Sequence, residues 1–333
     1  MRGAARRAPA WILSLALGAP GTLGVLGVLG ALGALGTLGT CALGCGPEVP
    51  PPGVGPGARP PRVERRVEPV DLLPADLDLV LRIDVARMRA GIGPSAADEL
   101  AARALADAPG ALWVEAARRA DVVWVGLRLA DLEAGDRVLA FEGKMRGLSP
   151  DLRDWERAPG DLPGVSVFDR RGGASRRGVA RVITLGDRAL VLVSPVEVAS
   201  VARVLREGPD ERRGDPAAEG IVSLDLRAGR LPPHLERRFP SIGSIIGGVE
   251  RIRATGTLTD EGARLEAEIV GRTPEGAGRA RRFLEVLRDN VQDLRYADLM
   301  RALAIEQVER TVRLRWTVPS RVVLALISGE EPG

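Results

Sequence analysis

The stretch 249–287 constrains the fold most, because two alternating runs meet at a turn and lead directly into a helical pattern. Apolar and polar residues alternate on both sides of the turn, which is the period of two of a half-buried strand. Pairing Leu258 with Ala263 places Arg253 opposite Glu268, so one register satisfies the apolar face and the polar face together. The sequence therefore predicts a strand, turn, strand and helix in this register.

Other segments carry strand or helix patterns, and together they predict an α+β protein. The expected strands lie at 77–85, 122–129, 138–145, 179–185, 189–193, 221–226 and 308–318. The expected helices lie at 95–106, 111–119, 195–206, 233–239 and 274–294, with a last one after Ser320. We expect antiparallel sheets, each covered on one face by helices.

Two parts of the folded chain have similar patterns, which indicates two degenerate repeats. Residues 81–85 and 222–226 have similar patterns, and each opens one half of the folded chain. The hairpin and helix also have a counterpart at 179–206, where Ser194 to Glu197 has the pattern of a capping box. We therefore hypothesise two α+β halves. They span 74–210 and 219–329.

The leader, 1–45, has the pattern of an export signal. Three arginines near its start precede a long uncharged apolar run that ends at Gly44, directly before Cys45. Positive residues stay on the cytoplasmic side while the apolar run enters the membrane, and a small residue before Cys45 suits cleavage there. We predict lipidation of Cys45 and an extracytoplasmic location, at the outer membrane or the periplasmic face. An uncleaved anchor is the alternative, because the run is long enough to span a bilayer.

A segment rich in proline and glycine, 46–73, follows the leader without apolar periodicity, so we predict a semi-extended tether. The end of the leader resembles the lipobox of bacterial lipoproteins, with Gly44 in the small position and Cys45 as the lipid-bearing residue. With its tether, a Leu-Pro-Ala-Asp start at 73–76 and two predicted halves, the chain resembles uncharacterised lipoproteins of GC-rich bacteria. The resemblance implies a membrane-anchored envelope protein with a duplicated α+β domain, and no particular activity.

The charge balance argues against nucleic acid as a partner. The chain has 47 basic and 44 acidic residues, but three arginines and no acids lie in the leader, so 44 basic residues balance 44 acidic ones elsewhere. A neutral chain with 3% aromatic residues lacks the basic surface and the stacking side chains that nucleic-acid binding uses.

Residues suited to catalysis or metal binding are scarce in the sequence. His234 is the single histidine and lies beside two prolines, where an ordinary surface position is the favoured interpretation. Cys41 and Cys45 are the two cysteines, and both lie in the leader. Histidine and cysteine sets for metals or nucleophilic catalysis therefore lack their residues, and we expect no cofactor and no metal.

Two groups of carboxylates have both a structural and a functional interpretation. Asp71, Asp76 and Asp78 form an acidic cluster with ligands of the type that calcium prefers, but solvated loop carboxylates are the favoured interpretation. Asp84 and Asp225 end similar strands of the two halves, and a capping or turn role is favoured over catalysis for both.

An uncharged stretch at 241–249 contains Ile242, Ile245 and Ile246. These isoleucines are either part of the core, which we favour, or an exposed contact site for a partner or a membrane surface.

The sequence as a whole predicts a non-catalytic envelope lipoprotein, a binding or structural module that contacts a membrane through its lipid and an unidentified envelope protein or ligand. Two alternatives stay open. A hydrolase that uses paired carboxylates needs two of them about 5–9 Å apart in a cleft. A carrier of apolar ligands needs a closed apolar cavity between sheet and helices.

Overall fold

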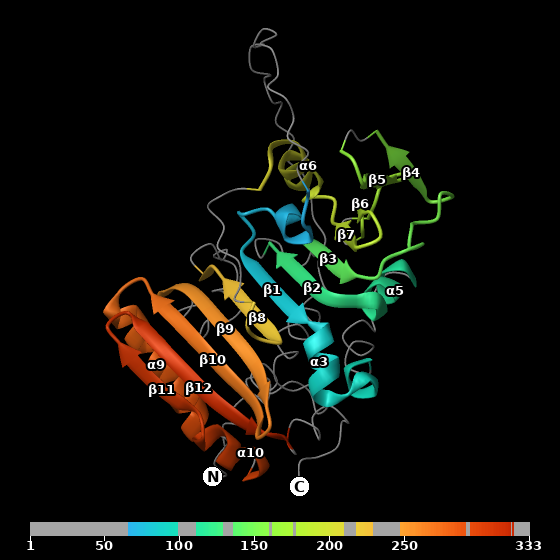
Figure 1. The fold of residues 1–333 in the computed structure, drawn as a ribbon. Helices are drawn as coiled ribbons and strands as arrows, with labels where there is room; N and C mark the ends of the chain where they lie inside the picture. Colours follow the sequence, from blue (N-terminus) through green and yellow to red (C-terminus); the bar gives the residue numbers. More distant parts are fainter. Residues whose placement is uncertain are drawn as a thin grey trace, which may run out of the picture.

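The computed structural model describes residues 66–98, 111–128, 136–159, 162–175, 178–209, 218–228, 247–290, 294–320 and 322. Its strands form one twelve-stranded sheet in the order β11-β12-β10-β9-β8-β1-β2-β3-β7-β6-β5-β4 (Figure 1). Every neighbouring pair of strands is antiparallel. The chain is therefore a mixed α+β protein made mostly of strands.

Most strands are short, and the β9–β10 hairpin is the longest element of the sheet. The strands are β1 Leu79–Asp84, β2 Ala120–Leu127, β3 Arg137–Gly143, β4 Trp155–Ala158, β5 Val165–Arg170, β6 Arg181–Leu185, β7 Ala189–Val193, β8 Val222–Leu226, β9 Val249–Thr259, β10 Gly262–Gly271, β11 Ala304–Val308 and β12 Thr311–Pro319. The helices are η1 Pro69–Leu72, which is a 3-10 helix, α3 Val85–Ile92, α5 Ala111–Arg119, α6 Val198–Glu207, α9 Pro274–Asp289 and α10 Leu294–Arg301.

A strand pair between the two parts of the chain joins them into one sheet, which corrects the expectation of separate sheets. β1 and β8 lie side by side with Leu81 opposite Leu224. From this central pair, β2 and β3 continue the sheet in one direction, and β9 and β10 continue it in the other. The β6–β7 hairpin, the expected counterpart of β9–β10, lies beyond β3 and not beside the central pair.

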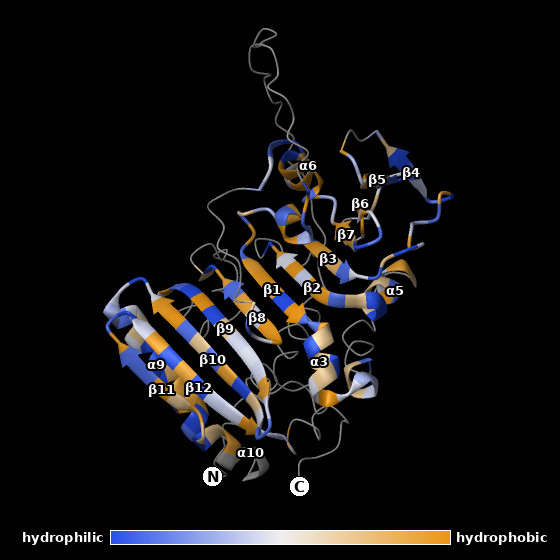
Figure 2. Ribbon diagram, in the orientation of Figure 1, coloured by the Kyte–Doolittle hydropathy of each residue, from blue (hydrophilic) through white to orange (hydrophobic). Residues whose placement is uncertain are grey.

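The β9–β10 hairpin has the predicted register. Leu258 pairs with Ala263, and Arg253 pairs with Glu268. Figure 2 shows the corresponding alternation of hydrophilic and hydrophobic residues along β10 and β12. On the polar face, exposed charges of alternating sign lie on one line across four strands: Arg253, Glu268, Arg313 and Glu306. Opposite charges as cross-strand neighbours favour this register on an exposed face.

Helices contact both faces of the part of the sheet that β1 to β7 form, the first part. Along β3, Val138 and Ala140 belong to an apolar cluster with η1 and α6, whereas Leu139 and Phe141 belong to a cluster with α3 and α5. The expectation of helices on one face is therefore wrong for this part, because consecutive residues of β3 are buried on opposite faces. In the second part, α9 packs on the sheet through a cluster that includes β10 and β12.

Two helix boundaries differ from the prediction. The helix expected at 274–294 ends at Asp289, and α10 follows as a separate helix. The helix expected from 195 begins at Val198, because the residues of the supposed capping box have other partners. Ser194 Oγ accepts a hydrogen bond from the Arg137 N–H at 3.0 Å, and the Glu197 carboxylate accepts one from Arg128 at 2.6 Å.

The predicted tether is too long at its C-terminal end. Residues 66–73 belong to the folded part, where Leu72 and Leu73 are 0% and 3% exposed. The sequence did not predict η1, α3, β4, β5 or β11. The helices expected at 95–106 and 233–239 lie largely or wholly outside the described residues.

Within the described ranges, no helix is long and apolar enough to cross a membrane.

Candidate functional site

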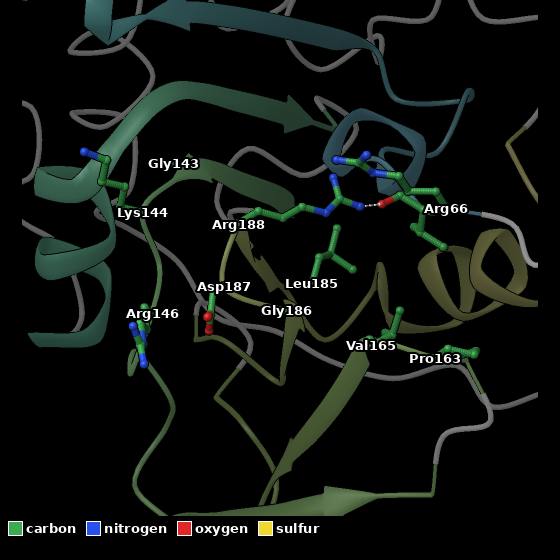
Figure 3. A pocket seen from close by; sticks show the side chains of 12 residues that line it. Arg66, Gly143, Lys144, Arg146, Pro163, Val165, Leu185, Gly186, Asp187 and Arg188 are labelled. Carbon is green, nitrogen blue, oxygen red and sulfur yellow. Dashed lines mark hydrogen bonds between the residues drawn. The ribbon is translucent and has the colours of Figure 1, made fainter.

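A pocket of about 540 Å³ opens beside the start of the described chain. Four segments form it (Figure 3). They are residues 66–67, which we call the entry segment, the end of β3 with the loop after it, residues 163–165 at the start of β5, and the β6–β7 turn. Its apolar lining comes from Val67, Pro163, Val165 and Leu185. Its charged lining comes from Arg66, Lys144, Arg146, Asp187 and Arg188.

Backbone hydrogen bonds hold the loop after β3 against the β6–β7 turn. The Gly143 N–H donates to the Arg188 carbonyl at 2.9 Å, and the Met145 N–H donates to the Asp187 carbonyl at 2.8 Å. These bonds flank Lys144, so its backbone is fixed at the pocket rim. Glycine is required at 143, because a Cβ there would lie 2.3 Å from the backbone oxygen at the end of α5.

One carboxylate holds two of the four cationic side chains in place. Arg188 contacts Glu68 at 2.6 Å, and Arg66 contacts the same carboxylate at 3.0 Å. Arg188 also donates to the Val67 carbonyl, so it fixes the entry segment against β7 (Figure 3). Arg66, Glu68 and Arg188 therefore form a charged wall on one side of the pocket.

The other two cations, Lys144 and Arg146, are exposed at the opposite rim (Figure 3). In the part of the chain that the structure describes, neither side chain makes an ion pair. Asp187 lies between the two rims and is also exposed. The charge of this pocket is therefore mainly positive, in a chain whose charges balance outside the leader.

The lining residues can be compared with the sites that the two alternative functions need, a hydrolase with paired carboxylates and a carrier of apolar ligands. Asp187 is the one carboxylate among the described lining residues, so this pocket does not offer the carboxylate pair that a glycoside hydrolase uses. Across the described ranges, no group of three or more potential ligands could hold a metal ion. The cationic rim also differs from the closed apolar cavity that a carrier of purely apolar ligands needs.

The acidic cluster predicted at 71–78 is neither a calcium site nor a set of solvated carboxylates. Asp71 accepts a hydrogen bond from the Glu68 N–H at 2.9 Å and so caps η1. Asp76 contacts Arg128 at 3.0 Å. Asp78 is 4% exposed at the start of β1. Asp71 and Asp76 therefore have separate structural contacts, and Asp78 is buried.

Asp84 and Asp225 have different environments. Asp84 caps α3 by accepting a hydrogen bond from the Arg87 N–H at 2.9 Å, which confirms the predicted capping role. Asp225 lies inside β8 and accepts from Arg251 Nε at 2.6 Å, so the prediction of a cap or turn is wrong there. The hydrogen bond to Asp225 raises the pKa of Arg251, against the opposing effect of burial. Both carboxylates are therefore occupied by structural contacts.

The remaining candidates from the sequence, Cys45, His234, Ile242, Ile245 and Ile246, lie outside the described residues. Conversely, none of the pocket cations was predicted from the sequence as a site residue. Lys144 could have been chosen, because it is the single lysine of the chain.

Comparisons with known proteins give partial likenesses. No protein-family model matches the chain. A stretch of 98 residues is 40% identical to part of the phosphoglucosamine mutase of Anaeromyxobacter dehalogenans strain 2CP-C. The match covers 27% of this chain and 21% of the mutase, so the chain spans about a fifth of that enzyme's length.

Two solved structures are similar to the chain at low sequence identity. Crystal form I of TP0453 has a TM-score of 0.49 and 12% identity, and the match covers 80% of this chain and 100% of that one. Crystal form III has a TM-score of 0.46 and 12% identity, with 79% and 98% covered. None of these likenesses assigns an activity to this chain.

Proposed function

We propose that the chain is a non-catalytic envelope lipoprotein, a binding or structural module held at a membrane by lipid on Cys45. The observation that carries the proposal is the apolar leader that ends at Gly44, directly before Cys45, and the pocket lined by Arg66 and Val67 lies about 20 residues after it in the sequence. Residues 46–65 connect them to Cys45, and a proline-rich linker of this length spans at most about 60 Å. Arg66, at the pocket, then lies within about 60 Å of the lipidated residue.

The environment of the buried carboxylates supports a module without catalysis. Asp84, Glu197 and Asp225 are each bonded to an arginine. A catalytic acid or base must lie within hydrogen-bond reach of its substrate, and these three side chains are buried against their arginines. These carboxylates therefore serve the fold.

Replacing Cys45 by serine is expected to abolish labelling of the protein by a fatty-acid analogue in cells. The thiol that would carry the lipid is then absent, while the rest of the leader is unchanged. Cys41→Ser is the matched control and should keep the label, because Thr40 precedes it and not a small lipobox residue. Label retained on Cys45→Ser would overturn the proposed anchoring.

We also infer that the two halves of the chain are degenerate repeats. The order of strands supports this, because β1, β2 and β3 follow one another outward from the central pair just as β8, β9 and β10 do. Superposing the two sets of three strands tests the idea. Strands that match in direction but place their side chains on opposite faces would overturn it.

A further inference from the structure

We infer that the pocket beside Arg66 binds a phosphate group, either a free phosphate or the phosphate of a lipid headgroup. This inference deepens the proposed function and rests on it. The first observation is charge: four cationic side chains line the pocket, against the carboxylates of Asp187 and the neighbouring Glu68. An excess of positive charge in a concave site attracts anions.

The positive charge of the pocket differs from the charge balance of the whole chain. Outside the leader the chain has equal numbers of basic and acidic residues. On the exposed face of β10 and β12, arginines contact carboxylates. Arg264 contacts Glu266 at 2.6 Å, and Arg313 contacts Glu268 at 3.4 Å. Lys144 and Arg146 make no such pair among the described residues. Their charges are therefore available to a ligand.

The arrangement of the cations fits a phosphate better than a single carboxylate. Arg188 is held by Glu68 and the Val67 carbonyl on one side, and Lys144 and Arg146 extend from the other rim (Figure 3). A phosphate has oxygens that accept hydrogen bonds from several sides and carries up to two negative charges. Lys144 and Arg146 are exposed, so their side chains can change rotamer toward a ligand within picoseconds to nanoseconds without a change of the backbone.

The apolar lining determines which phosphate compounds fit. Pro163, which is exposed, and Val165, which is half-buried, lie next to the charged rim. They offer contact area to the glycerol and acyl carbons of a lipid, which inorganic phosphate lacks. A lipid phosphate should therefore bind more tightly than inorganic phosphate if the headgroup is the natural ligand.

Calorimetric titration of the full chain in a nonionic detergent tests the inference, with inorganic phosphate and dihexanoyl phosphatidic acid as probes. Lys144→Gln with Arg146→Gln should weaken binding of both probes about tenfold or more, because two charge-assisted hydrogen bonds are lost. Asp187→Asn should tighten it about threefold, because a repelling charge is removed. The matched control, Arg279→Gln with Arg282→Gln on exposed positions of α9, should change it less than about twofold.

The outcomes separate the two sources and the two proposals. Tighter binding of the lipid assigns the headgroup, and equal binding assigns free phosphate. Failure of both probes to bind, or unchanged binding in the Lys144 and Arg146 variant, would overturn the inference. Thermal unfolding of each variant checks that it is folded, and the opposite effect of Asp187→Asn gives an independent reading. Fatty-acid label on Cys45 of the unmodified protein without phosphate binding would overturn this inference alone, whereas absence of label from the unmodified protein would overturn the proposed function.

Discussion

Replacing Arg128 by methionine is expected to lower the free energy of unfolding by about 3 kcal/mol. Arg128 donates to both carboxylate oxygens of Glu197, at 2.6 and 3.2 Å, and to Asp76 at 3.0 Å. The Glu197 side chain is fully buried, so methionine leaves a carboxylate in the interior without its counterion. The hydrogen bond to Glu197 raises the pKa of Arg128 above its usual range, against the effect of burial, so the guanidinium stays charged.

The double variant Arg128→Met with Glu197→Met should regain much of that loss, because it removes the buried charge pair, and Asp76, which also loses a contact with Arg128, is 48% exposed to water. Arg310→Met is the matched control. Its pair with Glu250 at 3.3 Å is 55% exposed on both sides, so its loss should cost less than about 1 kcal/mol. Chemical denaturation followed by circular dichroism measures all three variants. A loss in Arg128→Met as small as that in Arg310→Met would show that the buried pair is unimportant for stability.

Replacing Gly262 by alanine is expected to destabilise the protein by about 3 kcal/mol. Gly262 begins β10 with a φ of +147°, and an added Cβ would lie 2.0 Å from the Val318 carbonyl oxygen. It would also lie 2.8 Å from the Ser320 nitrogen. Both atoms belong to the backbone, so rotation of a side chain cannot relieve the clash. The variant must instead move β12 away from the hairpin.

Gly172→Ala is the matched control for this prediction. Gly172 has a φ of +69°, but nothing lies within 4 Å of the added Cβ. Its substitution should cost only the penalty of a left-handed residue, about 1–2 kcal/mol. Denaturation curves of the two variants, measured side by side, separate the clash from the backbone conformation. Equal losses would mean that β12 does not pack against Gly262 as described.

Local patterns were sufficient to predict the central hairpin. Both strands of β9–β10 alternate over about ten residues, and the two faces require the same register, so pairing Leu258 with Ala263 satisfied both. By contrast, β4 is four residues long and mostly exposed at the edge of the sheet, so its sequence shows no apolar alternation. The start of α6 was wrong for another reason. Ser194 and Glu197 have partners far away in the sequence, which local pattern does not reveal.

The pocket and the single sheet depend on contacts between distant segments. Pairing of β1 with β8 joins residues more than 130 positions apart, and no periodicity within either strand indicates its neighbour. The pocket cations come from the entry segment, the loop after β3 and the β6–β7 turn. Each segment alone has the composition of an ordinary charged loop. The pairing of β3 with β7, the backbone bonds that continue it, and the contacts of Arg188 with Glu68 and Val67 bring these charges together.

Mass spectrometry of the mature N-terminus, on protein extracted from native membranes, tests the anchoring of the module most directly. The expected result is a chain that begins at Cys45 and carries the added mass of lipid on that residue. A chain that keeps residues 1–44, or one that begins elsewhere without lipid, would contradict the proposed function.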